Sequence, residues 1–327
     1  MNRQRLSVAM CTYNGARFLS EQLESIAMQT RLPDELVVCD DGSVDEGVEI
    51  IRSFADHSPF PVRLEINEKN LGSTKNFEKA IGLCEGDIIA LADQDDVWKP
   101  QKLDVLTTIL ESHPGVGYAF SDAELMDDVG RSTGKGLWAS LRISAARINQ
   151  FRGTNQFPIL LGYPMATGAT MVFRASLRST LLPISRHLVH DYWISAIASS
   201  VGAFGVPVRE KLIQYREHDG QQIGPRSKSL IKKIKEARRL QSNQYDRLAQ
   251  GYEDLRRRLL LGATDGRTYP SSYMALVEEK ILHLFRRAAA RSTHGTGKVR
   301  RVLSEVVTGR YGRFSGSWRA VIKDLCF

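Results

Sequence analysis

Short apolar runs alternate with helical patterns over residues 6–122, and this alternation constrains the fold more than any other feature of the sequence. Each apolar run has the length of a buried strand, and most are followed by apolar residues at the three- or four-residue spacing of a one-sided helix. Because parallel strands need crossover connections, the order predicts an α/β sandwich with a mainly parallel central sheet. The predicted strands are 6–11, 36–39, 62–67, 87–92 and 116–122.

The second half of the chain carries weaker signals, and no element is assigned between residues 123 and 165. The tail from Ser292 contains Gly, Thr and Arg, and we expect it to be partly mobile. The further predicted elements are strands at 166–174 and 206–218 and helices at 190–202, near 227–261 and near 271–291.

The net charge of +8 is unevenly distributed along the chain. Residues 225–327 contain 23 Lys and Arg against 9 Asp and Glu, whereas residues 1–224 contain 22 against 28. This predicts two regions, an α/β domain over 1–224 and a basic α-helical region over 225–327. The basic region is either a solvated helical hairpin that packs on the core or mediates oligomerisation, or a surface that binds an anionic membrane. We expect no nucleic-acid binding, because no nucleic-acid-binding motif accompanies the charge.

The apolar content of 42% is that of a globular chain, and no stretch approaches the roughly 18 apolar residues of a membrane span. The four cysteines form no CxxC pair, and three of them lie in or beside apolar runs. The sequence therefore predicts reduced cysteines and a cytoplasmic location, at most peripheral on the inner face of the membrane.

Four polar clusters each follow directly on a predicted strand: TYNG (12–15), DDGS (40–43), NLG (70–72) and DQDDVW (93–98). Ligands of open parallel sheets bind at the carboxyl ends of strands, so these clusters should converge on one crevice. A single cluster such as DDGS could equally be a helix N-cap. Four of them in order favour a binding site.

The cluster DQDDVW places Asp93, Asp95 and Asp96 within four residues. Two like charges 4 Å apart repel by about 4 kcal/mol at an effective dielectric of about 20, so a cation or hydrogen-bond donors must hold them. Oxygen ligands favour a hard cation, Mg²⁺ or Mn²⁺. The alternative is an acidic turn in which Asp96 caps the next helix.

In this order, TYNG, DDGS, NLGSTKNF, DQDDVW, HDYW and YREH resemble the family 2 inverting glycosyltransferases of the GT-A fold, over about residues 5–220. The likeness is to the rhamnosyltransferase type that builds bacterial surface polysaccharides such as O-antigen. It implies a dTDP- or UDP-sugar donor, a saccharide or lipid-linked saccharide acceptor, and a divalent cation.

The same resemblance implies roles for individual residues. His218 and Lys75 are the weakest of these, since a lone His or a helical Lys is often a plain surface residue. The metal ligands implied are Asp93, Asp95 and His218, and the donor-binding residues are Thr12, Tyr13, Asn14, Asp40, Asp41, Asn70, Gly72, Lys75, Asp93 and Gly168.

Asp191, in HDYW, is the candidate general base. It lies at the start of a predicted helix, where the helix dipole stabilises a carboxylate. An inverting transfer needs one base to accept the proton of the acceptor hydroxyl. Asp191 could instead serve only as a helix cap.

Other enzyme classes fit the sequence less well. The first turn, TYNGARF, lacks the GxGxxG of dinucleotide-binding enzymes, and no GxxxxGK[ST] phosphate loop occurs. A nucleotidyltransferase or a non-catalytic nucleotide-sugar-binding protein on a similar fold remains as an alternative.

Overall fold

The computed structural model describes residues 3–153, 155–219, 242–264, 269–316 and 318–326. The chain forms two compact units. The sheet unit comprises Met1–Thr154, Ala166–Ile184 and His190–Arg226, and the helical unit comprises Asn155–Met165, Ser185–Val189 and Ser227–Phe327. The division at residue 224 stays a prediction.

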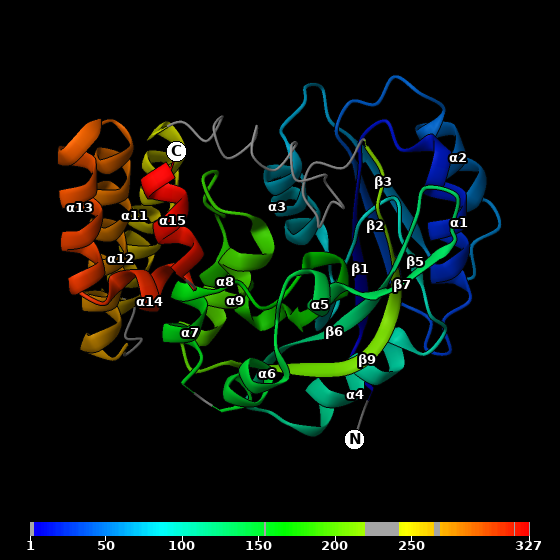
Figure 1. Cartoon of the computed structure of the whole chain (residues 1–327). Coiled ribbons are helices and arrows are strands. Elements are labelled where there is room, and N and C mark those ends of the chain that lie inside the picture. Colours follow the sequence, from blue (N-terminus) through cyan, green and yellow to red (C-terminus); the bar gives the residue numbers. More distant parts are fainter. Residues whose placement is uncertain (1–2, 154, 220–241, 265–268, 317, 327) are drawn as a thin grey trace. The chain divides into compact units, whose positions relative to one another are not determined.

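The sheet unit contains a nine-stranded sheet in the described residues, with the order β3-β2-β1-β4-β8-β6-β9-β5 and with β7 paired to β6 (Figure 1). Most predicted strands are present within a few residues. The strands are β1 (Leu6–Thr12), β2 (Glu35–Asp40), β3 (Val62–Ile66), β4 (Ile88–Ala92), β5 (Val97–Trp98), β6 (Val116–Met126), β7 (Ser132–Gly136), β8 (Met171–Arg174) and β9 (Phe204–Arg216).

The first four strands of the sheet order are parallel: β1 pairs with β2 and β4, and β2 pairs with β3. Thr12 lies opposite Asp40, and Met10 lies opposite Ala92, so the carboxyl ends of β1, β2 and β4 meet at one edge. β8 then joins antiparallel to both β4 and β6. The predicted α/β class with a mainly parallel central sheet is confirmed.

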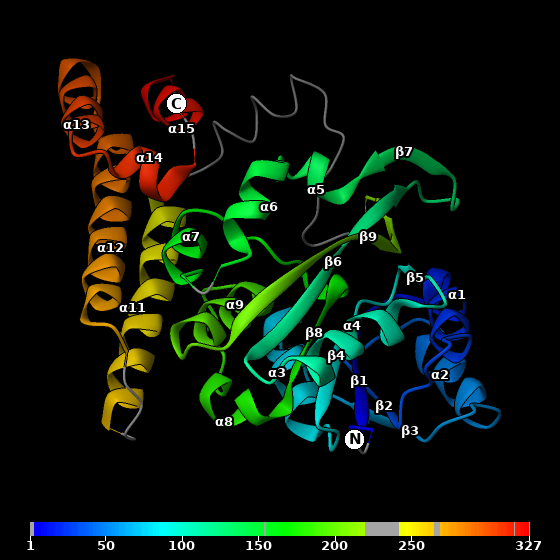
Figure 2. The same ribbon diagram turned by 90° about the horizontal axis from the view of Figure 1, so that it is seen from below.

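Helices cover both faces of the parallel strands. α1 and α2 lie on one side of β1–β3, and α3 lies on the other (Figures 1 and 2). Leu19, Leu23 and Ile26 of α1 recur at helical spacing and pack in the core with Val8 and Val38. The helices that flank the site are α1 (Ala16–Ala27), α2 (Gly47–Ala55), α3 (Ser73–Leu83), α4 (Lys102–Ser112) and α9 (His190–Ser200).

Two details differ from the sequence predictions. The strand expected at 166–174 is present only as β8, because Gly168–Thr170 forms a 3-10 turn that the bond from the Thr170 N–H to the Thr167 carbonyl closes. Asp96 does not cap the next helix. The N-cap of α4 is Gln101, and Asp96 Oδ1 instead accepts the Arg216 N–H at 3.1 Å.

The stretch without assigned elements contains β7 and three short helices, α5 (Leu137–Ser140), α6 (Ala145–Phe151) and α7 (Phe157–Gly162). A further short helix, α8 (Arg178–Leu181), lies between β8 and α9.

The helical unit contains α11 (Ser242–Thr264) packed beside α12 (Ser271–Arg291), as Figure 2 shows. The first part of the helix predicted near 227–261, as far as residue 241, is not among the described residues. The tail from Ser292 does not lack structure. It forms α13 (Gly295–Val307), α14 (Arg310–Ser315) and α15 (Trp318–Cys326).

Buried ion pairs fix the tail on the helical unit. The carboxylate of Asp324, in α15, is fully buried and accepts hydrogen bonds from Arg287 Nε at 2.6 Å and Arg291 Nε at 2.9 Å. The hydroxyls of Tyr311 and Tyr245 donate to the same carboxylate at 2.8 and 3.0 Å. These partners are far apart in sequence, so no local pattern indicated them. No helix in the described ranges is long and apolar enough to cross a bilayer.

The first stability prediction concerns Gly205, in β9. A Cβ at this position would lie 2.2 Å from the buried ring of Tyr118, so Gly205→Ala should lower the free energy of unfolding by about 1–3 kcal/mol through overpacking. Urea unfolding measures the effect. Gly153→Ala is the control, because a Cβ there meets nothing within 4 Å. Equal midpoints for the two variants would contradict the packing described here.

The second prediction concerns pH. The ring of His283 is fully buried between Glu305 and Ser315, and burial lowers its pKa to about 4. An unfolded His takes up a proton near pH 6.5, so the unfolded state binds more protons between about pH 6.5 and 4. The stability contributed by neutral His283 is thus present above this window and lost as the pH falls through it.

Urea unfolding at neutral and mildly acidic pH tests this. The acid sensitivity should weaken in His283→Gln, which keeps a polar group of similar reach, and should stay unchanged in the control His57→Gln, where the side chain is exposed. An unaltered pH slope in His283→Gln would show that other groups carry it.

Candidate active site

Asp40 joins the ends of β1 and β2. Its carboxylate is fully buried, and Oδ2 accepts the Thr12 hydroxyl at 2.8 Å. Oδ1 accepts the N–H groups of Ser43 at 2.8 Å and Gly42 at 3.1 Å. The DDGS turn is therefore organised around Asp40. It is not a helix cap, since α2 begins only at Gly47.

Asp41 holds the loop that follows β3. Its side chain is 3% exposed and accepts the backbone N–H groups of Leu71 at 2.7 Å and Gly72 at 2.8 Å, together with the Asn67 amide at 2.9 Å. Gly72 has φ of 81°, which a residue without Cβ adopts most readily. Asp41 thus fixes the NLG loop against the DDGS turn.

Tyr13 and Asn14 complete the connection between the four clusters. The Tyr13 N–H donates to Gln94 Oε1 at 2.7 Å, and Gln94 Nε2 donates back to the Tyr13 carbonyl at 3.1 Å. Asn14 Oδ1 accepts the Val44 N–H at 3.0 Å. The sequence analysis did not identify Gln94. Its position in DQDD, directly after a predicted strand, is the signal that could have indicated it.

The side chains of Asp93, Asp95 and Asp191 interact electrostatically although Asp191 is far away in sequence. Burial, followed by the negative charges of Asp95 and Asp191, raises the pKa of Asp93 to about 7. Burial and the neighbouring Asp95 also raise the pKa of Asp96. The site therefore concentrates negative charge in a place with little access to water.

Lys102 places a buried amino group beside these acids and was not identified from the sequence. Its side chain is fully buried, and Nζ donates to the Ala169 carbonyl at 2.8 Å and lies 3.1 Å from the centre of the Trp98 ring. Burial lowers its pKa, while Asp96 and Asp93 act in the opposite direction. A lysine in the first turn of a helix usually faces solvent, so no sequence pattern indicated that Lys102 is buried.

Asp191 lies in the first turn of α9. Its Oδ2 accepts the Gly168 N–H at 3.0 Å, and Oδ1 accepts the N–H of Tyr192 at 2.5 Å. The 3-10 turn that contains Gly168 therefore orients the carboxylate.

The ring of His190 lies against the turn that contains Gly168. Its ring is 5% exposed and stacks on Phe77 at 4.0 Å between ring centres, and burial lowers its pKa. A Cβ on Gly168 would lie 2.7 Å from His190 Nε2, so only glycine fits there without movement.

His218 and Arg216, at the end of β9, contact Asp95. His218 Nε2 lies 2.7 Å from Asp95 Oδ2, and Arg216 Nε donates to the Asp95 carbonyl at 2.8 Å. The Arg216 guanidinium also pairs with Glu21 and lies over the ring of Phe18. Among the described residues, no three His, Cys, Asp or Glu side chains are arranged to hold a metal by themselves.

Lys75 and Asn70 have partners within the chain. Lys75 Nζ bonds to Glu78 at 2.6 Å and to the Ile184 carbonyl at 2.8 Å, and Asn70 Nδ2 reaches the Asp41 carbonyl at 3.3 Å. Tyr13, by contrast, is 42% exposed.

A model of glycosyl transferase family 2 matches residues 7–180, more than half of the chain. The protein belongs to glycosyl transferase family 2. It is similar to an uncharacterized glycosyltransferase of Nostoc sp. (33% identity over 113 residues, 35% of each chain). It is also similar to the glucosyl-dolichyl phosphate glucuronosyltransferase of Haloferax volcanii (33% over 112 residues, 34% of this chain and 35% of the relative). The chain thus matches about a third of the length of these relatives.

Two solved structures share the fold over most of the chain. S. aureus TarS 1–349 in complex with UDP-GlcNAc has a TM-score of 0.60 at 14% identity and covers 97% of this chain and 82% of that one. A mannosyltransferase of Pyrobaculum calidifontis in complex with GDP-Man and Mn²⁺ has a TM-score of 0.56 at 17% identity and covers 100% and 87%. The fold is GT-A with an additional helical region at the C-terminus.

The hydrogen bonds of Asp41 lead to a prediction about the NLG loop. In Asp41→Ala, two backbone N–H groups and one amide lose an ionised acceptor, and the free energy of unfolding should fall by about 2–4 kcal/mol. Amide hydrogen exchange of Leu71 and Gly72 should accelerate.

Glu68→Ala is the control for this variant, because it removes an exposed carboxylate close to the same loop. If Leu71 and Gly72 kept their protection in Asp41→Ala, the loop would be held by something other than this carboxylate.

Proposed function

We propose that the protein is an inverting glycosyltransferase that moves a sugar from a nucleotide-diphosphate sugar to an acceptor hydroxyl. The observation that carries this proposal is the meeting of Asp93, Asp95 and Asp191 at the carboxyl edge of the sheet, where burial, together with the charges of Asp95 and Asp191, raises the pKa of Asp93 to about 7. Family membership supports the same reaction class.

Asp191 is the proposed general base. The acceptor oxygen forms a bond to the anomeric carbon while the bond from that carbon to the diphosphate breaks, and the acceptor proton moves to a carboxylate oxygen of Asp191. The Gly168 N–H at 3.0 Å fixes the orientation of Oδ2, and the helix N-terminus stabilises the negative charge. The nucleoside diphosphate leaves with the electron pair of the broken bond.

The residues present fit a divalent cation, Mg²⁺ or Mn²⁺. Asp95 and His218 place a carboxylate oxygen and an imidazole nitrogen 2.7 Å apart, and Asp93 lies close enough to Asp95 and Asp191 for their charges to raise its pKa. These donors suit Mn²⁺ or Mg²⁺ when substrate oxygens and water supply the remaining positions. Such a cation would neutralise the charge that develops on the leaving diphosphate.

Most of the proposed donor-binding residues fall into two groups, and Gly168 and Lys75 have separate roles. Thr12, Asp40 and Asp41 use their polar atoms within the chain and would shape the nucleotide site from behind. The residues at the loop surface would contact the nucleotide or ribose: Tyr13, Asn14, Asn70 and Gly72. Gly168 would lie beneath the donor sugar, and Lys75 would reach a phosphate only by leaving the Ile184 carbonyl.

The sugar and acceptor are proposals by resemblance. We infer a dTDP- or UDP-sugar, with rhamnose as first choice, and a saccharide or lipid-linked saccharide acceptor in cell-surface polysaccharide synthesis. The structural neighbours were solved with UDP-GlcNAc or GDP-Man, so all three nucleotides should be tested.

Measurement of nucleoside diphosphate release across UDP-, dTDP- and GDP-sugars tests the function. Asp191→Asn should lower turnover by about 10²–10⁴-fold through loss of the base, with donor binding kept. Asp95→Asn should weaken Mn²⁺ and donor binding together, and EDTA should abolish turnover. Asp56→Asn, an exposed carboxylate at the end of α2, is the control.

Three results would contradict the proposal. Near-normal turnover of Asp191→Asn would exclude Asp191 as the general base, and full activity in EDTA would exclude a role for the divalent cation. Release of pyrophosphate in place of a nucleoside diphosphate would identify a nucleotidyltransferase.

A further inference from the structure

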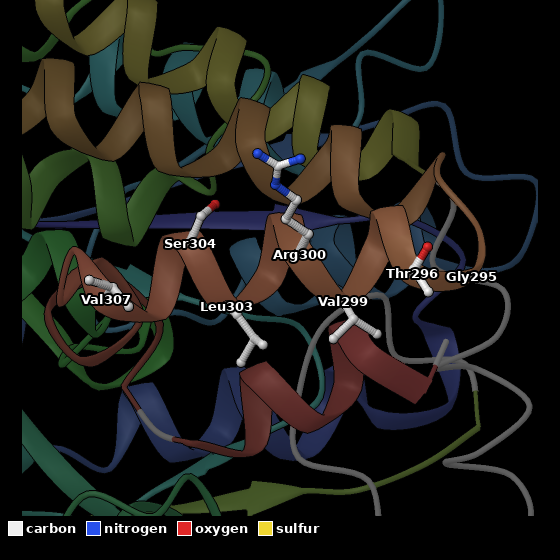
Figure 3. A pocket seen from close by; sticks show the side chains of 7 residues that line it. All are labelled: Gly295, Thr296, Val299, Arg300, Leu303, Ser304 and Val307. Carbon is white, nitrogen blue, oxygen red and sulfur yellow. The ribbon is translucent and has the colours of Figure 1, made fainter.

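One face of α13 exposes apolar side chains in a regular row. Val299, Leu303 and Val307 follow one another at four-residue spacing and are 44%, 51% and 88% exposed. Figure 3 shows Val299 and Leu303 projecting from the same side of the helix, along a shallow hollow. We call these three residues the α13 row.

The α13 row is not the side of the helix that packs in the unit. Val302 and Glu305, on other faces of the helix, are buried against the rest of the helical unit. Val302 belongs to the small core that also contains Ala290 and Tyr311. The exposed row is therefore additional to what the fold needs.

α15 adds a second exposed apolar pair beside the first helix. Ala320, Val321 and Leu325 pack toward α13, whereas Trp318 and Ile322, one turn apart, are 67% and 45% exposed. Trp318 differs from the other three tryptophans of the chain, which are at most 5% exposed. A large aromatic side chain left outside the core suits the boundary between water and lipid.

Within residues 295–327, the exposed charges have a single sign. Residues 295–327 contain seven Lys and Arg and two acids, Glu305 and Asp324. Both acids are buried, Glu305 beside His283 and Arg310, and Asp324 against two arginines. The acids thus neutralise interior cations.

The described surface of this segment therefore carries only positive charge. Arg300 is exposed and lines the same hollow as the α13 row, Arg301 is exposed on the other side of α13, and Arg319 is exposed beside Trp318.

The combination of exposed apolar side chains and exposed positive charge indicates which kind of partner binds this face. A second copy of the chain would bring a cationic face against a cationic face, and like charges oppose that contact. A nucleic acid would use the cations and leave the apolar row in water. An anionic lipid surface accommodates both, because apolar side chains enter the acyl boundary while the arginines meet the headgroups.

We propose that the exposed face of α13 and α15 docks the protein on an anionic membrane surface through the α13 row, Trp318 and Ile322, flanked by Arg300 and Arg319. This inference does not depend on the proposed reaction, and its test uses neither donor nor acceptor.

Tryptophan fluorescence of the full chain with lipid vesicles provides the test. Phosphatidylcholine vesicles containing phosphatidylglycerol should shift the emission to shorter wavelength, and brominated acyl chains should quench it. Vesicles of phosphatidylcholine alone should bind weakly. Trp318→Phe should remove the optical signal while sedimentation with vesicles persists, because the other tryptophans are buried.

Two variants separate the contributions to binding. Leu303→Ser should weaken sedimentation with anionic vesicles by about tenfold through loss of apolar insertion. Arg300→Gln combined with Arg319→Gln should weaken it by about tenfold or more and reduce its salt sensitivity. Leu260→Ser in α11 is the matched control, since Leu260 is 47% exposed and Leu303 is 51% exposed.

Equal binding to neutral and anionic vesicles, or wild-type binding by both variants, would overturn the proposal. So would a concentration-dependent dimer that Leu303→Ser dissociates, which would identify a second copy as the occupant. Circular dichroism and urea unfolding verify that each variant is folded before its binding is interpreted.

Discussion

The buried carboxylates of Asp40 and Asp41 are the interaction on which the rest of the site depends. An ionised carboxylate without water must find donors elsewhere, and here the donors are the backbone and side chains of three strand ends. Satisfying that requirement fixes the turns after β1, β2 and β3 relative to one another. These buried hydrogen bonds therefore hold in place the loop from which Tyr13 and Asn14 are exposed.

The acids at the end of β4 show the opposite situation. Asp93 and Asp96 have raised pKa values because burial and neighbouring carboxylates disfavour their charged forms, and burial likewise lowers the pKa of Lys102 beside them. A protein that needed only stability would replace such a cluster with apolar side chains. Its presence is the physical reason for regarding this edge of the sheet as functional.

The parallel half of the fold was predictable because its strands are continuous apolar runs that end in polar turns. The turn at Gly168–Thr170 was not, since hydrogen bonds to Asp191 and Lys102, both distant in sequence, hold its backbone. Gln94 and Lys102 were missed because their roles depend on which residues face them. The helices of the tail were missed because their stability comes from the buried Asp324 pairs.

The Asp324 cluster also determines when the helical unit can close. During synthesis, Arg287 and Arg291 leave the ribosome well before the carboxylate that neutralises them. Until that carboxylate arrives, burying either guanidinium would leave a charge without a partner at a cost of several kcal/mol. The order of synthesis therefore delays packing of the tail and keeps its helices in water until the chain has been extended through α15.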